Sequence, residues 1–157
     1  MTEFTDLTSF IAHVTAIEFV VQQEAERGLR RAAQVISDAA RKELGYYQPE
    51  VGPFVAWAPL ADSTLDHHRY LGVGESPELV TGQLYASIED EAQGKEAVSG
   101  SKLDIAEYQE VGTAKMPPRP IFGPAAWKSR DEIEKIIGEG AVKAMTYGAV
   151  GSWTSLE

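Results

Sequence analysis

Apolar residues recur at steps of three and four along the first third of the chain, which is the spacing of an amphipathic helix. Thr5 or Asp6 can cap the start of this helix, and Gly45 can end it. Gly28 marks a bend or a point of close packing near its middle. Small residues gather late in the segment, so we expect this part to pack on a sheet or on a neighbouring subunit. The apolar stripe consists of Leu7, Phe10, Ile11, Val14, Ile17, Val21, Ala25, Leu29, Ala32, Ile36 and Ala39.

Residues 46–80 have a different pattern, in which prolines and glycines interrupt any regular element. The sequence therefore predicts a loop here. A solvated linker does not need aromatic side chains, yet this segment is rich in them. We expect the loop to pack against the rest of the protein or to become ordered on assembly. Its aromatic residues are Tyr46, Tyr47, Phe54, Trp57 and Tyr70.

After this loop, Leu84–Ala92 and Glu96–Ser101 predict a two-stranded hairpin that turns near Gln93 and Gly94. The next segment, Leu103–Glu110, is a candidate for a short helix.

Glycine and proline then set the remaining boundaries. Gly112 ends the short helix, and Lys115–Pro120 is held extended by its prolines. Gly123 and Pro124 open a second helix, with the proline at the favoured first position. Its apolar stripe continues as far as Gly138.

Together these elements predict a single α+β domain over residues 1–157, in which helices cover a small antiparallel sheet. Its parts are an N-terminal helix (1–45), an aromatic and proline-rich loop (46–80), a region of sheet and C-terminal helix (81–146) and a frayed tail (147–157).

The composition excludes several classes of function. The chain has no cysteine, so disulfides and thiolate sites are excluded, and a reducing cytoplasm is the expected place of synthesis. There are 14 Lys and Arg residues against 24 Asp and Glu, for a net charge of −10. This charge disfavours a protein that grips DNA phosphates, but it suits one that DNA slides past. No apolar run reaches the roughly 20 residues that cross a bilayer, so we expect no membrane partner.

The charge is also uneven along the chain. Residues 75–110 are mainly acidic, and residues 111–135 carry an excess of basic side chains. Opposite patches suit head-to-tail contact between copies. The alternative is that both are solvated faces.

One cluster of side chains offers reactive chemistry: Asp62, Ser63, Asp66, His67 and His68. Carboxylates and imidazoles can hold a divalent metal or transfer protons, so a small metal-dependent hydrolase using Asp62, Asp66 and His67 is one hypothesis. His67 and His68 are adjacent, however, and point in different directions on a helix or strand. The favoured interpretation is a polar, solvated loop, and we expect neither a metal nor a cofactor.

A stiff strip follows the short helix, because Pro117, Pro118 and Pro120 fix its backbone in advance. Such a strip loses little entropy when it docks. The guanidinium of Arg119 suits a carboxylate on a neighbouring copy, for which Glu110 is one candidate. The alternative is that the strip merely connects two helices.

Four short motifs occur in a fixed order: T-G-x-L-x-x-S-I at 81–88, Y-Q-E-x-G-T at 108–113, M-P-x-R-P at 116–120 and P-A at 124–125. In this order they resemble the head–tail joining, or tail-completion, proteins of long-tailed bacteriophages, which are also described as minor neck proteins. The W-A-P-L stretch that begins at Trp57 resembles a motif of the related phage virion-morphogenesis proteins.

The resemblance implies a structural virion protein and no enzymatic activity. The family forms a homo-oligomeric ring, commonly a hexamer, at the head–tail junction beside other neck and tail proteins, and double-stranded DNA passes through the channel without specific binding. A tail-terminator ring that caps the tail tube is the alternative structural role. The residues assigned to subunit contacts are Glu110, Gly112, Thr113, Met116, Pro117, Pro118, Arg119, Pro120 and Phe122. The residues expected to shape the supporting hairpin are Thr81, Gly82, Leu84, Ser87 and Ile88.

Overall fold

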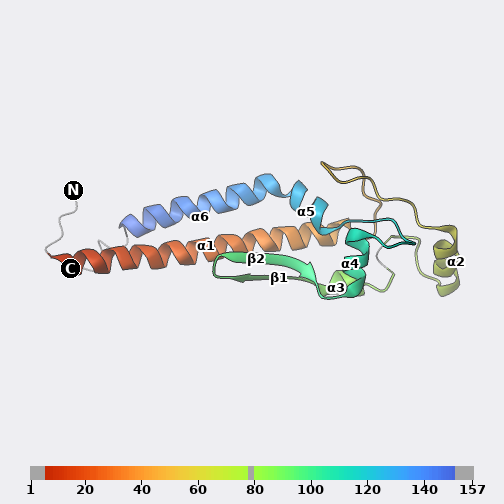
Figure 1. Ribbon diagram of the computed structural model, residues 1–157, viewed down its shortest axis with the longest axis horizontal. Helices are drawn as coiled ribbons and strands as arrows, with labels where there is room; N and C mark the ends of the chain where they lie inside the picture. Colours follow the sequence, from red (N-terminus) through yellow and green to blue (C-terminus); the bar gives the residue numbers. More distant parts are fainter. Residues whose placement is uncertain (1–5, 78–79, 151–157) are drawn as a thin grey trace.

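The computed structural model describes residues 6–77 and 80–150, with side chains as far as residue 146. One long helix, α1 (Leu7–Glu43), runs through most of the length of the molecule (Figure 1). Asp6 caps it, because its carboxylate accepts the backbone N–H of Ser9 at 2.7 Å. Gly45 follows the end of the helix with a positive φ of 91°. The predicted long helix is therefore confirmed at both ends.

The predicted hairpin is present, but its first strand starts later than expected. Strand β1 (Ile88–Gln93) pairs antiparallel with β2 (Glu96–Ser101), and Gly94 lies in the turn as predicted. The predicted start at Leu84 is wrong, because Gln83–Ser87 form the short helix α3. The hydroxyl of Ser87 donates to the carbonyl of Leu84 at 2.8 Å and stabilises this helical turn.

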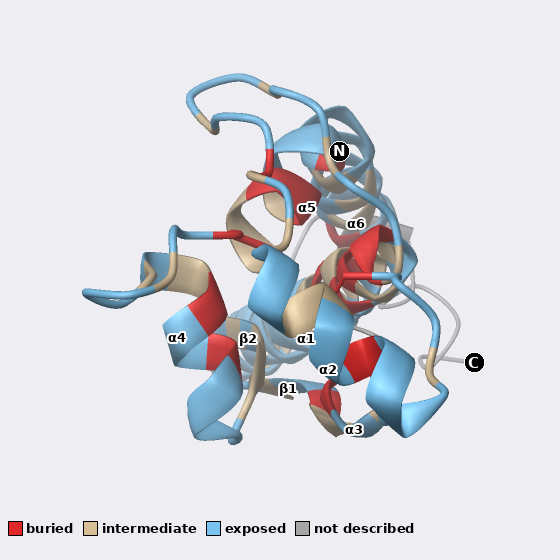
Figure 2. Ribbon diagram, turned by 90° about the vertical axis from the view of Figure 1, so that its right-hand side faces the viewer, coloured by how far each residue is buried: buried red, intermediate tan, exposed pale blue. Residues whose placement is uncertain are grey.

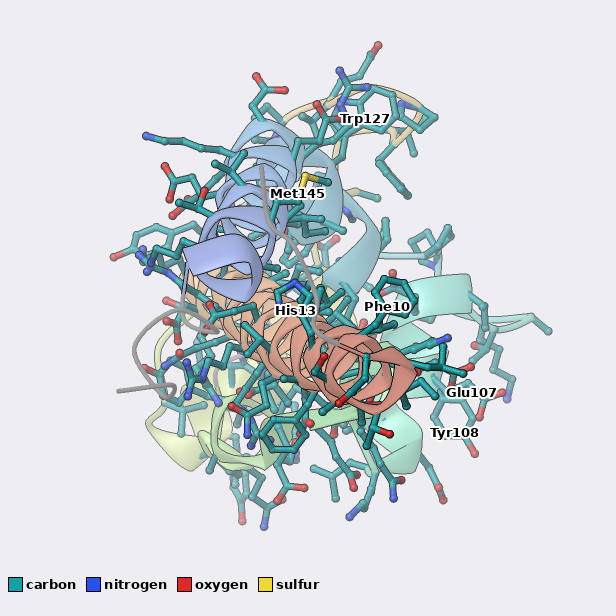
Figure 3. All side chains as sticks on the ribbon, turned by 90° about the vertical axis from the view of Figure 1, so that its left-hand side faces the viewer. Phe10, His13, Glu107, Tyr108, Trp127 and Met145 are labelled. Carbon is teal, nitrogen blue, oxygen red and sulfur yellow. The ribbon has the colours of Figure 1, made fainter. Side chains whose placement is uncertain are left out.

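Helix α6 (Arg130–Val150) lies along one side of α1, and the hairpin lies along the other side (Figures 1 and 3). On the hairpin side, the hydroxyls of Ser37 and Ser99 are 2.8 Å apart. On the α6 side, a Cβ atom built on Gly28 would lie 4.0 Å from the backbone oxygen of Ile136. Gly28 is therefore a point of close packing, one of the two roles predicted for it.

The C-terminal helical region is longer than predicted and is divided in two. Helix α5 (Phe122–Lys128) begins before Pro124, so this proline occupies the third helical position and not the first. After a break at Ser129, α6 continues past the predicted end at Gly138. A helix tolerates one glycine at a cost of about 1 kcal/mol, which packing on α1 offsets here. The predicted fraying is wrong for residues 147–150, which are helical, and residues 151–157 lie outside the described chain.

The predicted loop at 46–80 contains a helix, α2 (Asp62–Leu71), so the loop prediction is wrong there. This helix occupies a stretch free of proline and glycine, and Gly72 ends it in the left-handed conformation. The expectation that the aromatic residues pack holds for Trp57, which is 5% exposed. Tyr46 and Tyr70 are exposed and do not pack within the chain, so for them contact on assembly stays a prediction.

The hydrophobic core lies at the C-terminal end of α1, where α3, α4 (Asp104–Val111) and α5 gather around it (Figure 2). Helix α4 is the predicted short helix, and Gly112 ends it as expected. Within residues 6–77 and 80–150, no helix is long and apolar enough to cross a membrane. The buried core residues are Ala40, Leu44, Trp57, Leu84, Ile88, Ala106, Ile121 and Ala125.

Candidate functional site

Two of the motif strips contact each other beside the end of α1, although some 60 positions separate them. The indole Nε1 of Trp57 donates to the carbonyl of Pro120 at 3.0 Å. In return, Nε of Arg119 donates to the carbonyl of Ala58 at 3.2 Å, and Nη2 donates to that of Pro59 at 3.1 Å. The W-A-P-L and M-P-x-R-P strips thus satisfy each other's backbone groups. We refer to this arrangement, with Glu110, as the clasp.

Glu110 connects α4 to the start of α5. One carboxylate oxygen accepts the N–H groups of Ile121 at 2.7 Å and Phe122 at 3.2 Å, and the other accepts that of Gly123 at 3.0 Å. The first N–H groups of a helix have no partner within the helix, and they carry partial positive charge. A single side chain therefore satisfies three backbone donors at the point where the strip enters α5.

Gly112 is required by the turn that precedes the strip. Its φ is +76°, and a Cβ atom there would lie 2.8 Å from the backbone nitrogen of Pro118 and 2.9 Å from the oxygen of Met116. The neighbouring Thr113 N–H donates to the same Met116 oxygen at 2.8 Å. The glycine of the Y-Q-E-x-G-T motif thus allows the proline strip to fold back against α4.

The prediction that Arg119 projects toward a neighbouring copy is wrong. Its side chain is 4% exposed, and its donors bind carbonyl groups of the same chain. Glu110 is likewise occupied by backbone N–H groups, so it is not the carboxylate that receives an arginine. The buried carbonyls and N–H groups of two non-repetitive strips need partners, and these two side chains supply them.

The other predicted contact residues differ in their accessibility. Thr113, Pro117 and Pro118 are exposed, Gly112, Met116 and Phe122 are partly buried, and Pro120 is buried. For the accessible ones, contact with a neighbouring subunit stays a prediction.

The structure brings the two predicted sets of residues together around one groove of about 510 Å³. Thr81, Gly82 and Leu84 line one part of it, and Met116 and Pro117 line another. Ser87 and Ile88 lie outside the groove. The hydroxyl of Ser87 bonds to Leu84, as described above, and Ile88 belongs to the core.

Two polar residues that line this groove are not among the predicted contact residues, although Gln109 belongs to the Y-Q-E-x-G-T motif and His68 to the reactive cluster. Gln109 is 6% exposed, and its Oε1 has no hydrogen-bond donor among the described residues. His68 is also buried, and its Nδ1 lies 3.1 Å from the carbonyl oxygen of Gly74. The spacing of residues along the chain cannot predict that these two side chains are buried beside one groove, because their burial depends on contacts between distant segments.

The residues of the hydrolase hypothesis all lie on α2, so the predicted loop is wrong. The predicted exposure to solvent is confirmed for all of them except His68. Asp66 forms an ion pair with Arg69 at 3.0 Å, and His68 is buried away from solvent. Across residues 6–77 and 80–150, no group of three or more His, Cys, Asp or Glu residues is placed to hold a metal ion. Asp62, Asp66 and His67 therefore do not form a cluster in this part of the chain.

An ion pair between the buried Glu43 and the exposed Lys128 connects α1 to α5 beside the clasp. Nζ of Lys128 lies 2.9 Å from Oε1 of Glu43 and 3.0 Å from Oε1 of Gln48. Burial raises the pKa of Glu43, and the ammonium group of Lys128 offsets this increase only in part. The second carboxylate oxygen of Glu43 has no donor among the described residues.

Comparisons of the chain with protein-family models, with curated proteins and with solved structures find no match. The function is therefore argued from the residues themselves.

Proposed function

We propose that this chain is a structural virion protein of a tailed bacteriophage, a head–tail connector that forms part of a ring around the DNA channel in the neck. The observation that carries the proposal is the clasp. Trp57, Glu110 and Arg119 each belong to a different motif of the head–tail joining resemblance, and all three bind the same short segment or lie within it. This supports the resemblance, because unrelated chance matches have no reason to bond to one another.

The chemistry of the clasp also favours a structural role. Its indole, guanidinium and carboxylate groups bind backbone carbonyl and N–H groups of the same chain. Polar groups used in this way brace non-repetitive segments. In the clasp they hold the M-P-x-R-P strip in place, and we expect the exposed residues of this strip to contact a neighbouring subunit.

The two-helix part of the molecule offers a large surface for assembly. Beyond the turn of the hairpin, the N-terminal part of α1 and α6 lie against each other without a further layer (Figure 1). Apolar side chains are exposed along it, including Leu7, Val142 and Met145. Figure 3 labels Met145 on α6. Exposed apolar surface of this kind marks contacts between proteins. A ring of subunits would cover it.

The charge suits a channel that DNA passes through. With a net charge of −10, the subunit repels phosphate and does not retain DNA. Binding of duplex DNA at physiological salt should therefore be negligible, and a gel-shift assay that found tight binding would contradict the proposal.

Removal of the gene from its phage tests the role directly. We expect filled heads and separate tails to accumulate, and the purified wild-type protein should join them when it is added to the lysate. Adsorption to filled heads would indicate a neck protein, and adsorption to tails alone would indicate a tail terminator. Normal particles in the absence of the gene would refute both roles.

A further inference from the structure

The cations that are available for contact between copies differ from those that the sequence alone suggests. Residues 111–135 carry an excess of basic residues in the sequence, but most of these cations have partners within the chain. Arg119 is buried, and Lys128 binds Glu43 and Gln48. Arg130 lies beside two carboxylates of its own helix. This segment is therefore a poor candidate for the basic half of an interface.

Unpaired cations lie instead along a groove of about 490 Å³ between α1 and α6, which we refer to as the basic groove. Arg31 on α1 and Lys143 on α6 line it, and both are exposed. Neither forms an ion pair with any residue of the described chain. The two carboxylates in the lining, Glu24 and Glu139, already pair with Arg27 and Lys135.

Two glycines shape the floor of the basic groove. Gly28 of α1 and Gly140 of α6 both line it, and a Cβ atom on Gly140 would lie 3.5 Å from the backbone oxygen of Glu24. The helices therefore approach closely, and no side chain rises from these positions. The groove can accept a small apolar side chain between its cations.

The outer face of the hairpin carries exposed carboxylates, the charge complementary to that of Arg31 and Lys143. Val98 is 65% exposed on the face turned away from α1. Glu91 lies directly opposite it on β1, and Glu96 lies two positions before it on β2, so all three share that face. Neither glutamate forms an ion pair within the described chain. We refer to Val98 with these two carboxylates as the acidic knob.

We propose that the acidic knob of one copy docks into the basic groove of the next copy. Val98 lies over Gly28 and Gly140, and Glu91 and Glu96 meet Arg31 and Lys143. The contact relieves the repulsion between like charges on each surface.

The chain cannot make this contact with itself. Its own hairpin reaches a neighbouring groove, where Lys95 lies with Val21 and Ala144 and which shares only Glu24, Gly28 and Gly140 with the basic groove. The basic groove includes no hairpin residue. Because the two surfaces differ, the contact is head-to-tail, and a head-to-tail contact is the kind that builds a ring when its rotation closes. The inference rests on the proposed ring and specifies the surfaces that form it.

Engineered cysteines can detect the contact, since the natural chain has none. We would combine Val98→Cys with Glu139→Cys, which lines the basic groove. The control combines Val98→Cys with Glu134→Cys, an exposed glutamate on a different face of α6. Under mild oxidation, the first protein should form a ladder of disulfide-linked oligomers at least about tenfold faster than the control. Equal rates would overturn the inference.

Charge reversal tests, in the same crosslinking assay, whether the glutamates of the acidic knob meet the cations of the basic groove. One chain carries Val98→Cys with Glu91→Lys and Glu96→Lys, and the other carries Glu139→Cys with Arg31→Glu and Lys143→Glu. Either reversal alone should slow the mixed crosslink about tenfold, and the two together should restore it. If both reversals leave the rate unchanged, the inference is wrong. It is also wrong if Arg31→Glu instead abolishes binding to duplex DNA, because the groove would then contact DNA.

The head–tail joining assay separates this inference from the proposed function. If wild-type protein joins heads to tails but the Val98→Cys, Glu139→Cys protein forms no ladder, the inference alone is overturned. If the Val98→Cys, Glu139→Cys protein forms the ladder but wild-type protein does not join heads to tails, the neck role is overturned and the contact stays established.

Discussion

The substitution Glu110→Ala gives the sharpest test of the clasp. It removes the acceptor of three N–H groups at the start of α5. The N–H of Ile121 has no access to water, because Ile121 is 0% exposed, and an unsatisfied buried donor costs about 1–3 kcal/mol. The N–H groups of Phe122 and Gly123 belong to partly buried residues and can be hydrated in part, so each loses about 0.5 kcal/mol. We expect the free energy of unfolding to fall by about 2–4 kcal/mol.

Urea denaturation followed by circular dichroism measures this loss. The matched control is Glu107→Ala on the same helix, where the exposed carboxylate points outward (Figure 3). It should change stability by less than about 0.5 kcal/mol. Glu110→Gln keeps one acceptor oxygen, so its loss in free energy of unfolding should lie between the losses of Glu110→Ala and Glu107→Ala. If Glu110→Ala unfolds at the same urea concentration as Glu107→Ala, the carboxylate does not hold the strip and the account of the clasp is wrong.

Three further predictions concern the surroundings of the clasp. Gly112→Ala should cost about 2 kcal/mol or more, whereas Gly72→Ala, also at positive φ but in open space, should cost about 1 kcal/mol; equal losses in urea titrations would contradict the steric argument. Trp57→Phe should lower stability by about 1–3 kcal/mol, because the Pro120 carbonyl loses its buried donor, and a loss below about 0.5 kcal/mol would refute this. Burial raises the pKa of Glu43. Between the ordinary pKa of a glutamate and this raised pKa, the folded protein keeps a proton that the unfolded chain has released, so the free energy of unfolding falls as pH rises between the two. The Glu43→Gln variant lacks this pH-dependent contribution, so its stability relative to wild type should increase with pH in thermal melts. A difference in stability between variant and wild type that stays constant with pH would show that the pKa of Glu43 is not raised.

The elements that the sequence predicts well are those determined by local pattern. The stripe from Leu7 to Ala39 and the Asp6 cap predict α1, and Gly94 predicts the turn of the hairpin. Each depends on residues within a few positions of one another. Gly138 shows the limit of local signals, because packing of α6 on α1 outweighs one unfavourable glycine.

The clasp could be predicted only in part. The motifs single out Glu110 and Arg119, and both are central to it. Their partners could not be predicted, because Ala58 and Pro59 lie some 60 positions from Arg119 along the chain. A charged side chain in a sequence also suggests a charged partner. The hydrogen bonds of the clasp described above go to backbone groups, and every residue except proline offers both a donor and an acceptor.

The need for the clasp follows from how little sheet the fold contains. In the described chain, only β1 and β2 form a ladder, so the strips around Trp57 and Arg119 run beside the core without strand partners. Indole, guanidinium and carboxylate groups replace that ladder. Substitutions in the clasp should therefore act through stability, whereas substitutions in the basic groove should leave the fold intact and act through assembly. Loss of head–tail joining can arise by either route, and urea titration distinguishes them, since only the first lowers the free energy of unfolding.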